Sequence, residues 1–326
     1  MNKEIKIATI LPYKENYTFS KAAAASLWVS EFYKYSKFKK SNYIFGSTDS
    51  KDYLSKNYIN ININLKSKLS SSTIEYCNKF IKSSKKFDFD LIEIHNRPLV
   101  YTYLNKKLKS KFIFYFHNDP LSMKGSKTIK ERQTLINSID KIIFVSKWVQ
   151  KRFFLQLDQK LITKTEVIYP SIHLEKKLYP KKNRIVFVGK LNPSKGYDIY
   201  RDAIIKILDE FKSWEAFSIG DESRNKPIIS HPKHKELGFL NHRQVLDFLK
   251  FSEIAVVPSR WEEPFGRTAL ESSSRGCATI ISNRGGLPET TDYRVVLEKL
   301  NYQELYKSIK ELILNPKIRK KLQKNG

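Results

Sequence analysis

A short segment of the chain, residues 256–271, combines two carboxylates with a turn suited to an anion. Glu263 directly precedes Pro264-Phe265-Gly266, and Glu271 follows within the same segment. Because the residue before a proline avoids the α region, we expect Glu263 in a loop and Glu271 on the helix that follows. Free N–H groups at that helix start, together with the Thr268 hydroxyl, would face a phosphate. The spacing therefore predicts that the two acids hold different parts of one ligand.

Two further glycine loops are expected at strand ends in the same half of the chain. One contains Gly189, Lys190 and Lys195, and the other runs through residues 283–289. Glycine allows close approach of the backbone to a ligand, and lysine is a compact cation that suits phosphate. Each loop taken singly is better explained by an ordinary turn. Three such loops in succession favour a phosphate-binding site.

The elements that must position these loops alternate between strand and helix along the chain. This alternation predicts an α/β fold with two doubly wound, Rossmann-like domains facing a central cleft. We expect domains at residues 1–170 and 184–326, joined by a linker at 171–183. Ligands of such sheets bind at the carboxyl ends of the strands. Predicted strands are 5–10, 91–94, 112–116, 141–145, 184–189, 216–220, 254–258 and 278–282, and predicted helices are 21–35, 99–109, 129–139, 197–211, 243–250, 267–275 and 302–314.

Composition excludes several classes of protein. With 326 residues, of which 40% are hydrophobic, the chain suits two folded domains and is not disordered. No apolar run reaches the roughly 18–20 residues that a membrane helix needs. The start of the chain leads directly into a strand, so no signal peptide is expected. Cys77 and Cys277 give neither a disulfide framework nor a zinc spacing. We therefore predict a cytoplasmic protein, with peripheral attachment to the inner face of the membrane left open.

The formal net charge of +27 leaves three explanations open. An anionic membrane surface or acceptor is one, and a general compositional bias towards Lys, Asn and Ile is another. Nucleic acid is the least favoured partner, because no helix has DNA-reading spacing and no RNA-binding aromatic strand is present. Trp28, Phe32 and Tyr33 lie beside lysines on one predicted helix. That aromatic face is interpreted as packing on the sheet, with contact to lipid or a lipid-linked acceptor as the alternative.

The motifs of the second half resemble those of the retaining GT-B glycosyltransferases of family 4, also called group 1. The resemblance covers about residues 184–290. The Glu-seven residues-Glu pair with an internal Pro-Phe-Gly is its most specific part. The matching residues are Phe187-Val188-Gly189-Lys190, Lys195-Gly196, Leu237-Gly238-Phe239-Leu240, Pro258-Ser259, Glu263-Pro264-Phe265-Gly266, Glu271, Gly276 and Gly285-Gly286-Leu287-Pro288-Glu289.

This resemblance implies a role for each residue of the segment. Glu271 would hold the ribose of a nucleotide, and Glu263 the hydroxyls of the transferred sugar. Lys190 and Lys195 would neutralise the departing diphosphate, so neither a metal nor a cofactor is predicted. The loop at 238–240 would border the base. The predicted donor-binding residues are Gly189, Lys190, Lys195, Gly238, Phe239, Leu240, Glu263, Phe265, Gly266, Arg267, Thr268 and Glu271.

The first half resembles the family less closely. His95 and His117 end consecutive strands, and the family commonly places a histidine near the sugar at the second position. His117 is therefore predicted to be catalytic with Glu263 and Lys195, whereas a strand-end histidine is otherwise most often structural. Alanines at 22–25 stand where many relatives have a glycine pair, which puts donor contacts from this domain in question.

The prediction is a glycosyltransferase that moves a sugar from a nucleotide-diphosphate sugar to a hydroxyl of a glycan or lipid-linked acceptor. Cell-envelope biosynthesis is the favoured pathway, with retention of configuration and no metal. A non-catalytic protein that binds nucleotide sugars or nucleic acid with the same fold is the alternative. Asp88-Phe89-Asp90 is interpreted as a helix-to-strand turn and not as a metal site. The helix that usually closes such chains on the N-terminal domain is expected to be short or absent.

Overall fold

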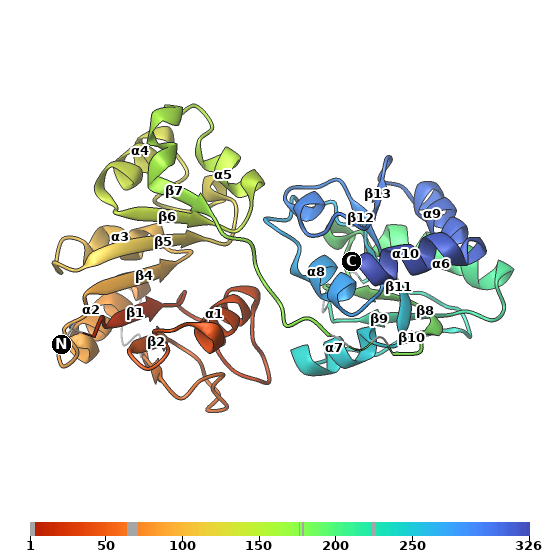
Figure 1. Ribbon diagram of the computed structural model, residues 1–326, viewed down its shortest axis with the longest axis horizontal. Helices are drawn as coiled ribbons and strands as arrows, with labels where there is room; N and C mark the ends of the chain where they lie inside the picture. The colour runs from red at the N-terminus through yellow and green to blue at the C-terminus, as the bar shows by residue number, and fades with distance from the viewer. Residues whose placement is uncertain (1–3, 64–70, 176, 178, 223, 225) are drawn as a thin grey trace. The chain divides into compact units, whose positions relative to one another are not determined.

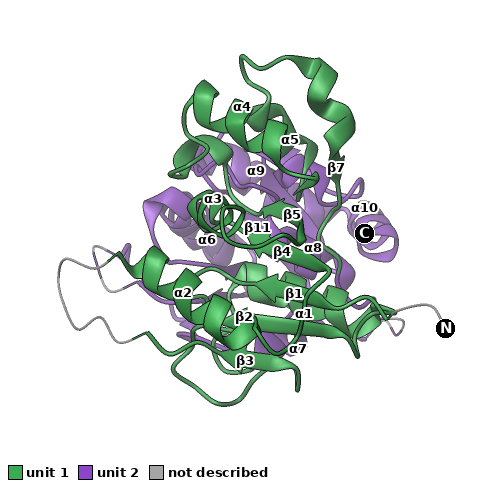
Figure 2. Ribbon diagram, turned by 90° about the vertical axis from the view of Figure 1, so that its left-hand side faces the viewer, with its two compact units in different colours: residues 1–171 green, residues 172–326 purple. Residues whose placement is uncertain are grey.

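The chain folds into two compact units, Met1–Ser171 and Ile172–Gly326, in which helices pack on parallel sheets (Figures 1 and 2). This computed structural model describes residues 4–63, 71–175, 177, 179–222, 224 and 226–326. The first strand of the second unit begins at Lys182, so the segment between the last strand of the first unit and this strand ends before residue 183. The predicted linker at 171–183 overlaps the start of this strand by two residues and otherwise stays a prediction.

The first unit is built on a seven-stranded sheet in the order β3-β2-β1-β4-β5-β6-β7. All its neighbouring strands are parallel. β1 is buried along its whole length, as expected for a central parallel strand covered on its faces. The strands are β1 (Ile7–Ile10), β2 (Asn42–Gly46), β3 (Tyr58–Asn60), β4 (Leu91–His95), β5 (Lys111–Phe116), β6 (Lys141–Phe144) and β7 (Thr165–Val167).

Three helices of the first unit were predicted, with shifted ends, whereas α2 and α5 were not predicted. The helix predicted at 99–109 ends at Leu104, because the chain turns immediately afterwards towards β5. Trp28 on α1 is buried and its ring lies 5.1 Å from that of Tyr115 on the sheet. The aromatic face of this helix therefore packs on the sheet, which was the preferred interpretation. The helices are α1 (Ala24–Tyr35), α2 (Ser72–Ser84), α3 (Pro98–Leu104), α4 (Ile129–Ser138) and α5 (Lys147–Phe153).

The second unit has a six-stranded parallel sheet in the order β10-β9-β8-β11-β12-β13. Its main core joins β8, β11 and β12 to the helices α6 and α9 through aliphatic and aromatic side chains. The strands are β8 (Lys182–Val188), β9 (Glu215–Ile219), β10 (His234–Glu236), β11 (Ser252–Val257), β12 (Ala278–Ser282) and β13 (Val295–Leu297), and the helices are α6 (Tyr197–Glu210), α7 (His242–Leu249), α8 (Arg267–Ser274), α9 (Tyr302–Leu314) and α10 (Pro316–Asn325).

In each sheet there is one point at which the order of the strands reverses, so that successive strands are added first on one side of it and then on the other. In the second unit this point lies between β8 and β11, because β8 is followed outwards by β9 and β10 on one side and neighbours β11 on the other. In the first unit it lies between β1 and β4. Crevices outside the carboxyl ends of strands at such points are where ligands bind in open α/β sheets. A ligand site is therefore expected at the loops that follow β8 and β11.

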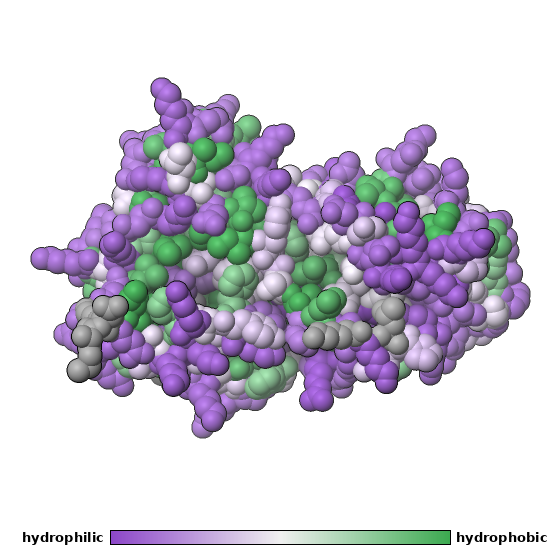
Figure 3. Space-filling view, in the orientation of Figure 1, coloured by the Kyte–Doolittle hydropathy of each residue, from purple (hydrophilic) through white to green (hydrophobic). Residues whose placement is uncertain are grey.

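Hydrophilic side chains cover most of the face shown in Figure 3, as the excess of lysine and arginine leads one to expect. Apolar residues are concentrated in the cores of the two units. Within the described residues, none of the helices is both long enough and apolar enough to cross a membrane.

Candidate active site

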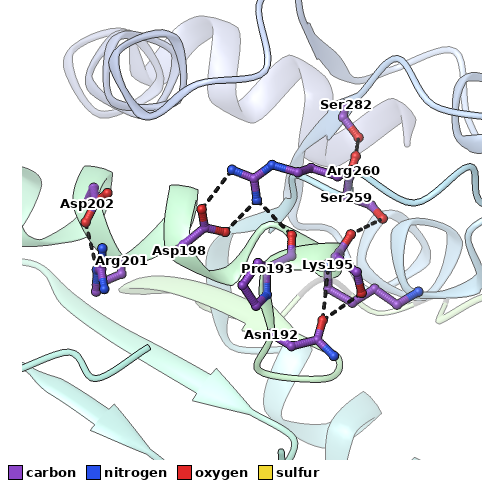
Figure 4. A network of polar contacts seen from close by, with 10 residues as sticks. Asn192, Pro193, Lys195, Asp198, Arg201, Asp202, Ser259, Arg260 and Ser282 are labelled. Carbon is purple, nitrogen blue, oxygen red and sulfur yellow. Dashed lines mark hydrogen bonds and ion pairs between the residues drawn. The ribbon is translucent and has the colours of Figure 1, made fainter. Parts of the chain in front are cut away.

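The loops after β8 and β11 are hydrogen-bonded to each other at the carboxyl edge of the second sheet. The carbonyl oxygen of Ser194 accepts hydrogen bonds of 3.0 Å from both Arg260 N and Trp261 N. Ser259 Oγ lies 3.4 Å from the same oxygen. The Ser259 carbonyl is held in turn by Ser282 Oγ at 2.6 Å, from the end of β12. Residues 259–261, in the loop after β11, thus connect this loop to the loop after β8 and to the end of β12 (Figure 4).

Arg260 fixes the first of these loops through its guanidinium group (Figure 4). Its two terminal nitrogens donate to Asp198 at 2.6 and 2.7 Å, and Nη1 also donates to the Pro193 carbonyl at 2.7 Å. Burial alone would raise the pKa of Asp198, but the Arg260 hydrogen bond and charge lower it below its ordinary value. A bidentate arginine holds its partner in a defined orientation, so the loop that carries Lys195 is clamped to α6.

Lys195 and Glu263 meet directly at this edge of the sheet. The distance from Lys195 Nζ to Glu263 Oε1 is 2.5 Å, and Ser259 Oγ donates to the same carboxylate oxygen at 3.0 Å. The Glu263 side chain is only 14% exposed and that of Lys195 is 31% exposed. Two of the three residues predicted to be catalytic therefore form one charged pair. Because the carboxylate is engaged by a cation and a hydroxyl, the arrangement suits hydrogen bonding to a polar ligand better than proton transfer.

The third glycine loop supports the backbone of Glu263. Gly286 N donates to the Glu263 carbonyl at 2.6 Å, and Gly285 N donates to Glu262 Oε2 at 2.6 Å. Gly285 has a φ of +58°, and a Cβ atom built there would lie 2.1 Å from the Glu263 carbonyl oxygen. Only glycine permits this close approach without displacement of the neighbouring backbone.

α8 begins at Arg267, where the sequence predicted the start of a helix. Gly266 precedes the helix in a left-handed conformation with a φ of +104°, and no side chain of the described residues caps the first turn. Arg267 and Thr268 begin the helix and are partly exposed, whereas the Phe265 side chain is buried. The first N–H groups of a helix have no partner within it, and the helix dipole adds positive potential there. The position can receive an anion.

Glu271 lies on the same helix and is only 6% exposed. Arg267 Nε donates to its Oε1 at 2.7 Å, and His242 Nε2 lies 2.9 Å from the same oxygen. Burial alone would raise the pKa of Glu271, but the His242 hydrogen bond and the Arg267 charge bring it below its ordinary value. Glu271 is therefore a buried carboxylate that is held ionised.

The remaining predicted binding residues of this unit line strand ends or lie on exposed loops. Gly189 follows β8, and its N–H donates to the Ile219 carbonyl at 2.9 Å. Lys190 is exposed and forms no ion pair within the described part of the chain. Gly238 has a φ of +66° with open space around the position of a Cβ atom. Phe239 is 59% exposed, and Leu240 packs at the edge of a small apolar cluster. These residues are near the surface and keep their assignments as predictions.

In the first unit, His95 and His117 form a hydrogen-bonded pair. His95 Nδ1 lies 2.7 Å from His117 Nε2, and the two rings stack with centroids 5.0 Å apart. Trp28 covers them, with its ring 5.2 Å from that of His117. Burial lowers the pKa of His117 to about 3, and burial followed by the neighbouring His117 lowers that of His95 well below its ordinary value. His117 is therefore neutral at pH 7 and directs Nε2 towards His95.

No metal centre emerges from the residues that the structure describes, since no three His, Cys, Asp or Glu side chains gather there. Asp88, with a φ of +50°, lies in the turn between α2 and β4, and Asp90 Oδ2 accepts a hydrogen bond from Lys6 N at 3.0 Å. This pair of acids therefore shapes a turn, as predicted.

Comparison with known proteins decides the family. The profile of "Glycosyl transferases group 1" matches residues 170–326, and that of "Glycosyltransferase Family 4" matches residues 47–176. An uncharacterised glycosyltransferase of Methanocaldococcus jannaschii is 35% identical over 250 residues, which cover 73% of this chain and 69% of that protein. The chain belongs to the group 1 glycosyltransferases.

Two further similarities agree with this assignment. Spore coat protein SA of Bacillus subtilis is 26% identical over 242 residues, covering 64% of this chain and 63% of that protein. The solved structure of the Anabaena protein HepE in complex with UDP-glucose has a TM-score of 0.74 at 17% identity, with 98% of this chain and 93% of that chain covered. The fold is therefore GT-B, and the chain is a sugar-transferring enzyme, as the sequence motifs indicated.

The structure of this glycosyltransferase also shows site residues that the sequence prediction missed. His242, Ser259 and Arg260 contact Glu271, Glu263 and the Lys195 loop respectively. Ser259 and Arg260 stand within the motif segment, so their position was a usable signal. His242 stands 29 residues from its partner and carries no motif of its own.

Proposed function

We propose that this enzyme takes a hexose or related sugar from a nucleoside-diphosphate sugar and transfers it, with retention of configuration, to a hydroxyl of a glycan or lipid-linked acceptor. The observation that carries the proposal is the pairing of Lys195 with Glu263 beside the uncapped start of α8 in the second unit. A cation and a helix N-terminus at one edge suit a diphosphate, and a fixed carboxylate beside them suits sugar hydroxyls. The UDP-glucose complex of the structurally similar HepE supports this choice of donor class.

The proposed chemistry develops negative charge on the leaving diphosphate. The bond between the anomeric carbon and the phosphate oxygen breaks while the acceptor oxygen bonds to the same face of that carbon. The acceptor's hydroxyl proton passes to the departing phosphate oxygen. Lys195 and the α8 N–H groups would stabilise the charge, so we propose that no metal is needed. Glu263 holds the sugar in this scheme because Lys195 and Ser259 already engage its carboxylate.

We propose that the enzyme acts in cell-envelope biosynthesis, on two grounds. The chain has a formal net charge of +27, which favours an anionic acceptor or membrane surface. Its relative in Bacillus subtilis is named as a spore coat protein. A membrane contact on the inner face would be electrostatic, and it would weaken with salt.

The test begins with thermal unfolding of the full chain in the presence of UDP-, GDP- and ADP-sugars. The sugar nucleotide that raises the melting temperature is then used in a transfer assay with glycan and lipid-linked acceptors. Product configuration is assigned from the anomeric proton coupling in NMR, and retention is expected. Activity with excess EDTA should equal activity without it.

Matched variants separate the enzyme from a binding protein of the same fold. Glu263→Ala and Lys195→Ala should each slow transfer by about 100-fold or more, whereas Glu298→Ala and Lys299→Ala, at exposed positions of the same unit, should not. Stabilisation by a nucleotide sugar without any transfer would favour the non-catalytic alternative. Activity unchanged in both site variants would contradict the site assignment.

A further inference from the structure

The carboxylate of Glu271 presents its two oxygens to very different surroundings. Both of its hydrogen bonds to other side chains within the described residues go to Oε1, from Arg267 Nε at 2.7 Å and from His242 Nε2 at 2.9 Å. Oε2 accepts no hydrogen bond from the described residues. It is also not fully buried, so solvent can reach it. One oxygen is therefore saturated and the other is left for a ligand.

His242 is held in place by local structure. It is the first residue of α7, where Asn241 and Gln244 form a reciprocal capping box that fixes the start of the helix. Its side chain is 20% exposed, against 7% for Glu271 and 12% for Arg267. Because a carboxylate only accepts hydrogen bonds, His242 must donate through Nε2–H. This contact joins the beginning of α7 to the second turn of α8.

The energetic need for a second donor follows from burial. A buried carboxylate that loses a partner costs several kcal/mol unless other donors compensate. The side chain of Arg267 is only 12% exposed, and its Nη1 and Nη2 atoms are buried without a hydrogen-bond partner among the described residues. Its guanidinium therefore bonds Glu271 through Nε alone, a single contact that leaves the carboxylate free to rotate about its last torsion. The bond from His242 comes from another helix and removes that freedom.

We propose that His242 is a positioning residue that presents Glu271 Oε2 to the ribose hydroxyls of the donor nucleotide. With Oε1 occupied by two donors, Oε2 is the acceptor that remains for the ribose. This inference rests on the proposed role of Glu271 in binding the donor. It adds a residue outside the motif segment to the nucleotide site, and it assigns a separate task to each carboxylate oxygen.

The experiment compares His242→Leu with His242→Gln in the full chain. Leucine removes the donor at similar volume, whereas the amide nitrogen of glutamine can stand where Nε2 stands. Dissociation constants are measured by calorimetry for UDP, GDP and ADP and for their 2′,3′-dideoxy counterparts. Loss of one hydrogen bond to a charged group is worth about 1.5–3 kcal/mol, so His242→Leu should weaken the preferred ribonucleotide about tenfold or more. His242→Gln should stay within about threefold of the wild type.

The dideoxy nucleotides distinguish positioning from a merely structural effect. They carry no ribose hydroxyl for Oε2, so His242→Leu should change their affinity less than about twofold. Equal loss with both kinds of nucleotide, or no loss with the ribonucleotide, would overturn the inference. In the transfer assay the donor KM should rise more than kcat falls.

Glu271→Gln separates this inference from the proposed function. If Glu271→Gln binds every ribonucleotide as tightly as the wild type, or if none of the three diphosphates binds the wild-type chain, the donor site itself is wrongly assigned. If Glu271→Gln weakens binding and His242→Leu does not, only the role of His242 fails.

Discussion

Lys195 Nζ lies 2.5 Å from Glu263 Oε1, although 68 residues separate the two in the chain. The pair is shared by the loops after β8 and β11, at the point where the strand order of the sheet reverses. Its members would serve different parts of one donor, the cation facing the diphosphate and the carboxylate facing the sugar. Each side chain also restrains the other before any ligand binds.

Removal of either member should therefore damage turnover more than stability. Lys195→Ala should lower kcat by about 10²–10³-fold, the usual effect of losing one preorganised donor to a developing negative charge. The melting temperature should change little, because partly exposed ion pairs contribute about 0–1 kcal/mol. Steady-state kinetics and thermal unfolding of the same preparations measure both quantities.

A double mutant reports whether the pair acts as a unit. Lys195→Ala with Glu263→Ala should cost less than the sum of the single losses, since each single variant leaves a charge without its partner. Simple additivity of the two losses would show that the contact is incidental.

The sequence predicts the alternation of strands and helices well, and the reason is physical. Buried parallel strands such as β12 are continuous apolar runs, and the loops between them carry glycines with positive φ. The three-residue edge strands β3, β7, β10 and β13 were missed, because so short a segment has no periodicity to detect. The five-residue strand β2 was missed as well.

The candidate site was predicted as a set of residues and not as a set of contacts. Motif positions named Lys195, Glu263 and Glu271, but which side chains touch depends on how separate loops meet. His95 and His117 were named as ends of consecutive strands, and since β4 and β5 are parallel neighbours their pairing follows from the topology. His242 could not be found in this way, because its contact depends on the packing of α7 on α8.

The histidine pair predicts a loss of stability in mild acid. Burial lowers the pKa of His117 to about 3 from an ordinary 6.5, so the unfolded chain binds a proton in a pH range where the folded chain does not. The stability is fully present above about pH 6.5 and is lost as the pH falls towards 3. At pH 5 this histidine alone should cost about 2 kcal/mol. Urea unfolding at pH 7.5, 6 and 5 measures the free energy of unfolding.

His117→Gln is the control for that titration. Glutamine can still hydrogen-bond to His95 but does not bind a proton in this range, so the variant should lose less stability between pH 7.5 and pH 5. An identical pH dependence in the variant and the wild type would mean that other groups cause the acid sensitivity.

Arg260 should act on catalysis through the loop that it clamps. Arg260→Lys keeps the charge but cannot form the bidentate contact to Asp198 or hold the Pro193 carbonyl at the same time. We expect kcat/KM to fall about tenfold, equivalent to about 1.4 kcal/mol, with the melting temperature nearly unchanged. Arg201→Lys, which changes another arginine bonded to an aspartate on α6, is the matched control and should retain full activity. An equal fall in kcat/KM in the two variants would show that Arg260 has no specific role in positioning the loop.

Alanine substitutions at Gly285 and Gly238 separate the cost of a steric clash from the cost of a left-handed backbone conformation. Both have positive φ, but a Cβ atom at Gly285 would lie 2.1 Å from the Glu263 carbonyl oxygen, whereas no atom of the described residues lies within 4 Å of one at Gly238. Gly238→Ala should cost only the left-handed conformation of alanine, about 1–2 kcal/mol. Gly285→Ala must in addition displace the Glu263 backbone, so its free energy of unfolding should fall by at least about 1 kcal/mol more. It should also raise the donor KM, because Glu263 moves with its backbone. Equal destabilisation by the two alanines, measured by urea unfolding, would show that the loop at 285–286 can relax away from Glu263.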